Sequence, residues 1–332
     1  MRKRSGWSVA ILLLCATVSV RSCSDCCHAA DAPAAATGPV GPRLQATSVN
    51  IKATTGYGGA QGSGTVVLRK VENVDTAFVV TAAHVIDGLR SVQETIVAGD
   101  KKQHVTYRDA QIVQEVATTD GSRTVGDTRL DARVLCVDYS RDIAVLRVRA
   151  QATLKSSAEF YKGQEIPQAG TEILHCGSPG GQDTGGTATL TSGIISRTGV
   201  RIPDFGGSDN GVFDQTDTAA LGGSSGGMVC LRSTGEWIGM ITLGLGGGGG
   251  DSFHWFVPVR AVREFCDKAK CAWLLDAGVA MTEKDLEAIP VELAPPIKGG
   301  STAPPHGATR MLLEEPPSPV LDRVLRDHGG PK

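Results

Sequence analysis

The sequence predicts an all-β fold, a barrel or a sandwich. From about residue 62 to residue 259, short β-branched and apolar runs alternate with turns rich in Gly, Asp and Ser. Glycine is abundant at 42 residues and aromatic residues make up 5% of the chain, which favours tight turns over long helices. Apolar residues make up 41%, enough for a core. The close spacing of the runs favours a barrel or sandwich over βαβ units.

Nine segments are candidate strands, and one helix is expected directly after them. The helix covers residues 259–275, where Ala261, Val262, Phe265 and Trp273 can share one face. The candidate strands are residues 65–68, 77–81, 132–137, 143–148, 172–176, 187–196, 228–231, 237–243 and 254–259.

The two ends of the chain differ in composition from its middle. Residues 1–30 have a positive start and an apolar segment at 7–20, which predicts a secretory signal peptide and an exported protein; a retained signal anchor is the alternative. Residues 31–60 are predicted to be a flexible linker and 61–280 the folded domain. Residues 281–332 are predicted to be a disordered tail, because nine of the 16 prolines fall at or after Pro290.

Charge and cysteine usage exclude several classes of protein. A formal charge of −2 gives no case for a nucleic-acid partner, and no stable membrane span is expected once the signal is removed. No metal or cofactor is expected, since the cysteine run near the amino terminus misses the haem-attachment pattern. Five cysteines remain in the expected mature chain, and their pairing is left open: Cys136, Cys176, Cys230, Cys266 and Cys271.

A serine-containing turn at residues 216–227 is the most specific chemical signal. Ser225 lies among glycines, which let the backbone fold tightly around an exposed hydroxyl. The pattern Gly223-x-Ser225-x-Gly227 also fits the nucleophile elbow of α/β-hydrolases, which would make the protein an esterase. However, β-type sequence follows Ser225, where such an elbow requires a helix.

A base and an acid precede this serine in the chain. His84 ends a buried-type strand, and Asp142 stands at the start of the apolar run 143–148. A carboxylate at that place is partly buried and needs a partner. The order His84, Asp142, Ser225 differs from that of α/β-hydrolases, in which the serine comes first.

These segments together resemble chymotrypsin-like serine proteases of the HtrA/Deg family. The resemblance covers roughly residues 60–275. It implies two six-stranded antiparallel Greek-key β-barrels and a carboxy-terminal helix. The segments that carry it are 62–64, 81–85, 142–146, 177–179, 191–196, 216–227 and 235–240.

The resemblance also implies the role of each candidate residue. Ser225 would be the nucleophile, His84 the general base, and Asp142 the group that orients the imidazole. The backbone N–H groups of Gly223 and Ser225 would form the oxyanion hole. The substrate pocket would be lined by Ala219, Met240, Thr242, His254 and Phe256.

Several positions depart from the pattern of relatives. Ser224 stands where digestive-type relatives carry an aspartate, so activation by a cut amino terminus is not expected. Ala219 at the base of the pocket disfavours cleavage after Lys or Arg and favours a small or medium apolar side chain. His254 and Phe256 replace a usual glycine and alanine, and they narrow or reshape that pocket.

The sequence therefore predicts an exported serine endopeptidase that degrades unfolded or damaged proteins. About 55 residues follow the helix, too few for a PDZ domain, while a homotrimer of protease domains is compatible with the resemblance. Gly246–Gly250 is expected to be either an activation loop that orders on binding or a merely flexible hairpin. The alternatives in function are a catalytically weak, protease-like binding scaffold and an α/β-hydrolase esterase.

Overall fold

The first of two closed barrels contains six antiparallel strands. The computed structural model describes residues 39–55, 58–97, 100–118, 124–150, 154–180, 187–202, 211–245 and 253–296. The first barrel has the order β7-β6-β1-β2-β3-β8, and β8 closes it by pairing with β7. Its strands are β1 (Ser48–Thr55), β2 (Gly58–Val71), β3 (Val74–Thr81), β6 (Ala110–Ala117), β7 (Thr124–Asp138) and β8 (Ile143–Val148).

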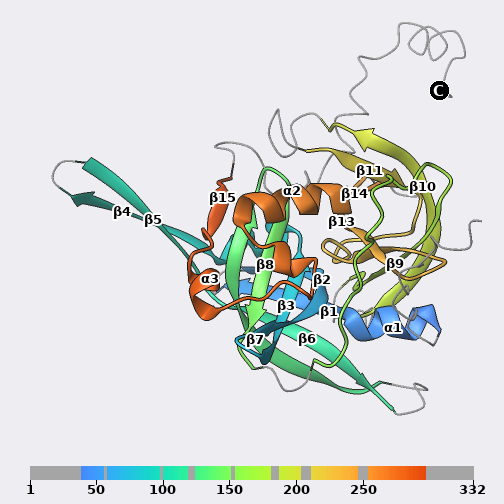
Figure 1. Cartoon of the computed structure of the whole chain (residues 1–332), viewed down its shortest axis with the longest axis horizontal. Coiled ribbons are helices and arrows are strands. Elements are labelled where there is room, and N and C mark those ends of the chain that lie inside the picture. Colours follow the sequence, from blue (N-terminus) through green and yellow to red (C-terminus); the bar gives the residue numbers. More distant parts are fainter. Residues whose placement is uncertain are drawn as a thin grey trace, which may run out of the picture. The chain divides into compact units, whose positions relative to one another are not determined.

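The second barrel also has six antiparallel strands, in the order β10-β11-β14-β13-β12-β9. Figure 1 shows it beside the first barrel. Its strands are β9 (Glu172–Gly177), β10 (Thr189–Val200), β11 (Phe213–Thr216), β12 (Met228–Leu231), β13 (Trp237–Leu245) and β14 (Phe253–Pro258). The prediction of two six-stranded barrels is confirmed. The α/β-hydrolase alternative is wrong, because the antiparallel strand β12 follows Ser225 where that fold needs a helix.

All nine predicted strands lie within or overlap observed strands, and the most apolar were the easiest to find. Strand β8 illustrates why an apolar strand is easy to recognise in the sequence. Ile143 and Val145 pack into a core shared by both barrels and helix α2, whereas Ala144 and Leu146 fill the inside of the first barrel. Since successive side chains point to opposite faces, a strand buried on both faces reads as a continuous apolar run.

The predicted helix at 259–275 is shorter than expected. Helix α2 (Val259–Ala269) ends because Lys270 adopts a left-handed conformation with φ +56°. The N–H of Cys271 then donates to the carbonyl oxygen of Cys266 at 2.8 Å, which satisfies a helix-end acceptor. A short 3₁₀ turn, η3 (Ala272–Leu274), continues the chain and buries Trp273 in the same core.

The structure corrects both predicted boundaries of the domain. Residues 40–55 and 58–60, expected in the linker, form helix α1 (Val40–Thr47), strand β1 and the start of β2. Strand β1 is part of the barrel because it pairs with both β2 and β6. Within the predicted tail, helix α3 (Glu283–Glu287) buries Leu286, and β15 (Glu292–Ala294) pairs with β7 in parallel.

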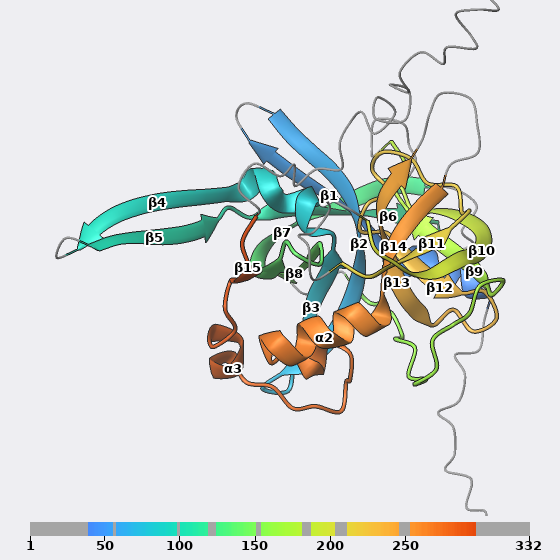
Figure 2. The same ribbon diagram turned by 90° about the horizontal axis from the view of Figure 1, so that it is seen from above.

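A two-stranded hairpin leaves the first barrel just after His84. The 3₁₀ helix η1 (Ala83–Leu89) leads into β4 (Arg90–Val97), which pairs with β5 (Asp100–Tyr107). Both views show this hairpin reaching away from the barrels (Figures 1 and 2). Sequence reasoning missed β4 and β5 because their side chains are mostly polar and exposed.

Three predicted features lie outside the described residues. These are the signal peptide at 1–30, the glycine run at 246–250 and the part of the tail beyond residue 296. No helix in the described ranges has the length and apolarity needed to cross a membrane.

Candidate active site

The structure brings His84 and Asp142 together at one end of the first barrel. His84 lies in η1, directly after β3, and its side chain is 10% exposed. Asp142 lies in the turn between β7 and β8, with its side chain 5% exposed. The His84 Nδ1 atom is 2.9 Å from Asp142 Oδ2, and the His84 backbone N–H donates to Asp142 Oδ1 at 2.9 Å.

This geometry fixes the protonation pattern of the imidazole. An ionised carboxylate only accepts hydrogen bonds, so the proton of the neutral ring resides on His84 Nδ1. The lone pair is therefore on His84 Nε2, the nitrogen that a general base uses. The second contact, from the backbone N–H, holds the carboxylate against rotation.

The turn that carries Asp142 is held by a buried carboxylate four residues earlier. Asp138 Oδ1 accepts hydrogen bonds from the backbone N–H groups of Ser140 and Arg141, at 2.9 and 3.2 Å, and from the Ser140 hydroxyl. Its Oδ2 accepts from Arg141 Nη1 at 2.9 Å. These bonds stabilise a turn in which Asp142 has a φ of +57°, a conformation that a non-glycine residue seldom adopts.

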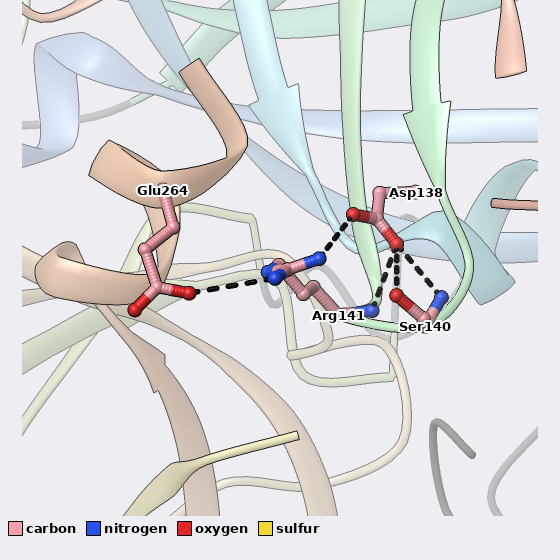
Figure 3. Close-up of polar contacts among 4 residues, drawn as sticks. All are labelled: Asp138, Ser140, Arg141 and Glu264. Atoms are coloured by element: carbon pink, nitrogen blue, oxygen red, sulfur yellow. Dashed lines mark hydrogen bonds and ion pairs between the residues drawn. The ribbon is translucent and has the colours of Figure 1, made fainter. Parts of the chain in front are cut away.

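Arg141 connects this turn to helix α2. Its guanidinium lies between Asp138 on one side and Glu264 on the other, with Nη2 3.4 Å from Glu264 Oε2 (Figure 3). The Arg141 side chain is 6% exposed, so its ion pair with Asp138 is buried. A buried arginine without its carboxylate would be strongly unfavourable.

Ser225 comes from the second barrel, in the turn between β11 and β12. Two glycines flank it with positive φ, +95° at Gly223 and +84° at Gly226. A Cβ atom at Gly226 would lie 2.2 Å from the carbonyl oxygen of Ser63. The backbone of β2 in the first barrel therefore packs closely against this turn. The Ser63 N–H donates to the Ser225 carbonyl oxygen at 2.7 Å, a further link between the barrels.

The Ser225 hydroxyl donates to the Thr242 carbonyl oxygen at 3.4 Å and makes no hydrogen bond with His84 in this structure. A hydrogen bond between a nucleophile and its base is often long in the absence of substrate and tightens on binding. The structure therefore places the three predicted residues at the junction of the two barrels, with the His84–Asp142 contact formed.

The two N–H groups expected to form the oxyanion hole are unpaired. Among the described residues, neither the Gly223 nor the Ser225 N–H donates to a protein acceptor. The Gly223 carbonyl oxygen instead accepts from the Ser63 hydroxyl at 2.7 Å, and Ser63 Oγ in turn accepts from the Ser178 N–H at 2.7 Å. These contacts orient the peptide between Gly223 and Ser224, whereas the peptide that carries the Gly223 N–H is held by the Gly180 N–H, which donates to the Gly222 carbonyl oxygen at 2.6 Å.

Thr242 has a contact that sequence reasoning missed. It was predicted to line the pocket, yet its hydroxyl donates to Asp142 Oδ2. Nothing in the spacing of the sequence pairs residues 100 positions apart. The only available signal was the position of Thr242 on β13, the second strand after the serine turn.

The other predicted pocket residues fall into three groups. Ala219 is exposed, and its carbonyl oxygen accepts from the Thr191 hydroxyl at 2.9 Å. Met240 and Phe256 are 0% and 1% exposed and lie in hydrophobic cores. His254 is also buried, at the edge of the serine turn.

Several buried titratable groups lie outside the predicted set of site residues. Burial lowers the pKa of His175 to about 4, although its contact with the Met228 carbonyl oxygen at 3.0 Å acts in the opposite direction. The five cysteines of the expected mature chain are all buried free thiols. In the described ranges, no group of three or more His, Cys, Asp or Glu side chains is placed to hold a metal ion.

Several curated proteins are similar to this chain in sequence. The serine protease Do-like HtrB of Bacillus subtilis is 27% identical over 197 residues, covering 58% of this chain and 36% of that protein. The HtrA-like serine protease of Staphylococcus haemolyticus is 27% identical over 212 residues, covering 62% and 28%. The chain thus spans only about a third of the length of these relatives.

Solved structures and a family model were also compared with the chain. A variant of the HtrA-type protease AlgW with a tripeptide has a TM-score of 0.49 and 22% identity, covering 72% of this chain and 63% of that one. Deg5 has a TM-score of 0.48 and 20% identity, covering 73% and 94%. The family model of the trypsin-like peptidase domain matches residues 62–240, more than half of the chain. The chain belongs to the trypsin-like peptidase family, and the relatives that it matches are serine proteases of the HtrA type.

Proposed function

We propose that this protein is a serine endopeptidase whose catalytic residues are Ser225, His84 and Asp142. The observation that carries the proposal is the double contact of Asp142 with the Nδ1 atom and the backbone N–H of His84, at 2.9 Å each. That contact leaves Nε2 as the base. A hydroxyl on the neighbouring barrel and two unpaired N–H groups complete the requirements for acyl transfer.

The reaction follows from these positions. Ser225 Oγ attacks the carbonyl carbon of the substrate, and His84 Nε2 takes the hydroxyl proton. The N–H groups of Gly223 and Ser225 stabilise the negative oxygen of the tetrahedral intermediate. His84 then gives its proton to the leaving amine, and water hydrolyses the acyl-enzyme with His84 again acting as base.

Unfolded or damaged proteins outside the cytoplasm are the proposed substrates. Support for this comes from the HtrA-type relatives and from the signal-like sequence at residues 1–30. Expression with the native amino terminus, followed by fractionation and amino-terminal sequencing, tests the proposed export. Sedimentation velocity tests the proposed homotrimer.

One experiment tests the enzymatic proposal against a binding scaffold. The purified protein is treated with a fluorophosphonate probe, and casein degradation is followed in parallel. Labelling and proteolysis are expected in the wild type, lost in Ser225→Ala and retained in the control Ser91→Ala, which changes an exposed serine on β4. A folded wild type that is neither labelled nor proteolytic refutes the proposal and favours a scaffold.

A further inference from the structure

Helix α2 ends in a backbone arrangement that brings Cys266 and Cys271 together. Lys270 has the left-handed conformation, and its N–H donates to the carbonyl oxygen of Asp267 at 3.4 Å. The N–H of Cys271 donates to the carbonyl oxygen of Cys266 at 2.8 Å. These two bonds form a Schellman motif, in which the side chains at the two outer positions commonly touch. In this chain both outer positions are cysteines.

The backbone hydrogen bond limits how far apart the two cysteines can lie. With standard bond lengths, an N–H to carbonyl contact of 2.8 Å keeps the Cα atoms of Cys266 and Cys271 no more than about 6.7 Å apart. Disulfide bonds usually span Cα separations of about 4.4–6.8 Å. The separation of the two residues therefore fits a disulfide bond.

The two side chains already contact each other inside the protein. In this structure both are free thiols, and the residues are 1% and 2% exposed. A hydrogen bond with the Cys266 side chain, together with burial, raises the pKa of Cys271. A thiol that stays protonated is a poor nucleophile, so we expect the folded, reduced protein to be oxidised slowly.

A third thiol, that of Cys136 on β7, is the competing partner for Cys271. Burial, followed by the charge of Cys271, raises the pKa of Cys136 to about 12, which indicates that the two sulfur atoms are near each other. Within the described ranges, however, Cys136 is the register partner of Val145 and shares no backbone hydrogen bond with Cys271. Cys266 is therefore the better placed partner.

We propose that Cys266 and Cys271 form a disulfide bond when the protein folds in an oxidising compartment. One thiolate attacks a disulfide oxidant, such as glutathione disulfide, and the second thiolate then displaces the remaining half of the oxidant. The two cysteines lose two protons and two electrons, and the oxidant becomes two thiols. The bond forms before the helix end is buried. The inference is independent of Ser225, and the proposed export supplies only the compartment.

The bond fixes the turn that joins α2 to η3. Arg69 on β2 donates to the carbonyl oxygens of Trp273 and Leu274 at 2.6 Å each, which holds η3 against the first barrel. The Trp273 ring lies 4.6 Å from the ring of Phe78 on β3, measured between their centres. The disulfide therefore stabilises the place where the carboxy-terminal helix meets this barrel.

Peptide mapping tests the pairing directly. The purified full-length chain is reduced, unfolded and refolded in a glutathione redox buffer, and its free thiols are then alkylated in denaturant. Trypsin cuts after Lys268 and Lys270, between the two cysteines, so the bond links peptides 264–268 and 271–284. Mass spectrometry is expected to find these linked peptides, with alkylated thiols at Cys136, Cys176 and Cys230.

The same mapping is applied to protein produced with its native amino terminus and recovered after export. Free thiols at Cys266 and Cys271 in the refolded or the exported protein overturn the inference, as does a bond between Cys136 and Cys271. A Cys266–Cys271 bond that forms on refolding, in a chain that cells do not export, supports the inference and refutes the proposed export.

Thermal unfolding measures what the bond contributes. Protein refolded with glutathione disulfide is expected to unfold about 4–8 °C above protein refolded in excess reductant. The double variant Cys266→Ser/Cys271→Ser is expected to show no such difference, and Cys266→Ala/Cys271→Ala replaces it should the serines impair folding. Cys136→Ala is the matched control and is expected to keep the difference. A double variant that keeps the difference, or a Cys136→Ala protein that loses it, contradicts the proposed pairing.

Discussion

The hydroxyl of Thr242, on strand β13 of the second barrel, donates a hydrogen bond to the carboxylate of Asp142 in the first barrel. Asp142 Oδ2 thereby receives two donors, since His84 Nδ1 is 2.9 Å from the same atom. The carbonyl oxygen of Thr242 also accepts the Ser225 hydroxyl at 3.4 Å. One residue therefore contacts both the proposed acid and the proposed nucleophile.

Thr242→Val is expected to lower kcat by about 10- to 100-fold with little change in KM. A hydrogen bond to a charged group is worth roughly 1.5–3 kcal/mol, and its loss leaves Asp142 less well oriented toward His84. Steady-state kinetics on a peptide substrate measures this. Thr242→Ser keeps the hydroxyl and is expected to retain most of the activity; equal losses in both variants would show that packing, not the hydroxyl, matters.

Asp138→Asn is expected to lower the free energy of unfolding by about 3 kcal/mol and to reduce kcat of the folded enzyme. The change leaves the guanidinium of Arg141 buried without its carboxylate and loosens the turn that presents Asp142. Urea denaturation and kinetics at low temperature measure the two effects. Asp127→Asn breaks an exposed pair with Arg129 and is expected to cost less than about 1 kcal/mol. Equal effects of the two changes would contradict this role of Asp138.

Gly226→Ala is expected to destabilise the protein by several kcal/mol and to abolish labelling by the fluorophosphonate probe. Gly226 has a φ of +84°, and an added Cβ would lie 2.2 Å from the Ser63 carbonyl oxygen and 2.4 Å from Thr81 Oγ1. Gly222→Ala is the matched control, because a Cβ there has no neighbour within 4 Å. Thermal unfolding of both variants checks this, and a Gly226→Ala protein as stable as Gly222→Ala would rule out the close contact between barrels.

The protein is expected to lose stability as the pH falls from about 7 to about 4. The pKa of buried His175 is about 4, against 6.5 for an ordinary histidine, so the unfolded chain takes up a proton in this window before the folded one does. A pKa shift of this size lowers the free energy of unfolding by up to about 3 kcal/mol over this pH range. The lowered pKa of His254 acts in the same direction. Urea denaturation at pH 7, 6, 5 and 4.5 measures the slope.

His175→Asn removes the titrating group and keeps a donor for the Met228 carbonyl oxygen. This variant is expected to show a shallower pH dependence whatever its absolute stability. His104→Asn alters an exposed histidine and should leave the wild-type slope unchanged. A His175→Asn protein with the full wild-type slope would assign the acid sensitivity to other groups.

The fold was predictable because its central strands carry strong local signals. Strand β8 is apolar on both faces, and the turn at residues 216–227 is rich in glycine, so both can be found without knowing their neighbours. The hairpin β4–β5 and the short strand β15 were missed because polar side chains on an exposed ribbon or a barrel edge give little periodic signal. The tail boundary was misplaced for another reason, because Leu286 is buried in a core that it shares with residues distant in the sequence.

The sequence by itself determined the candidate residues His84, Asp142 and Ser225, because each stands in a short segment whose composition suits its place at a strand end or in a tight turn. Only the tertiary structure decided how they meet. Thr242 pairs with Asp142 across 100 residues, Asp138 holds the turn beside it, and His254 lies against Gly244. These contacts join separate strands and barrels, and side-chain packing between elements distant in sequence leaves no pattern in the local order of residues.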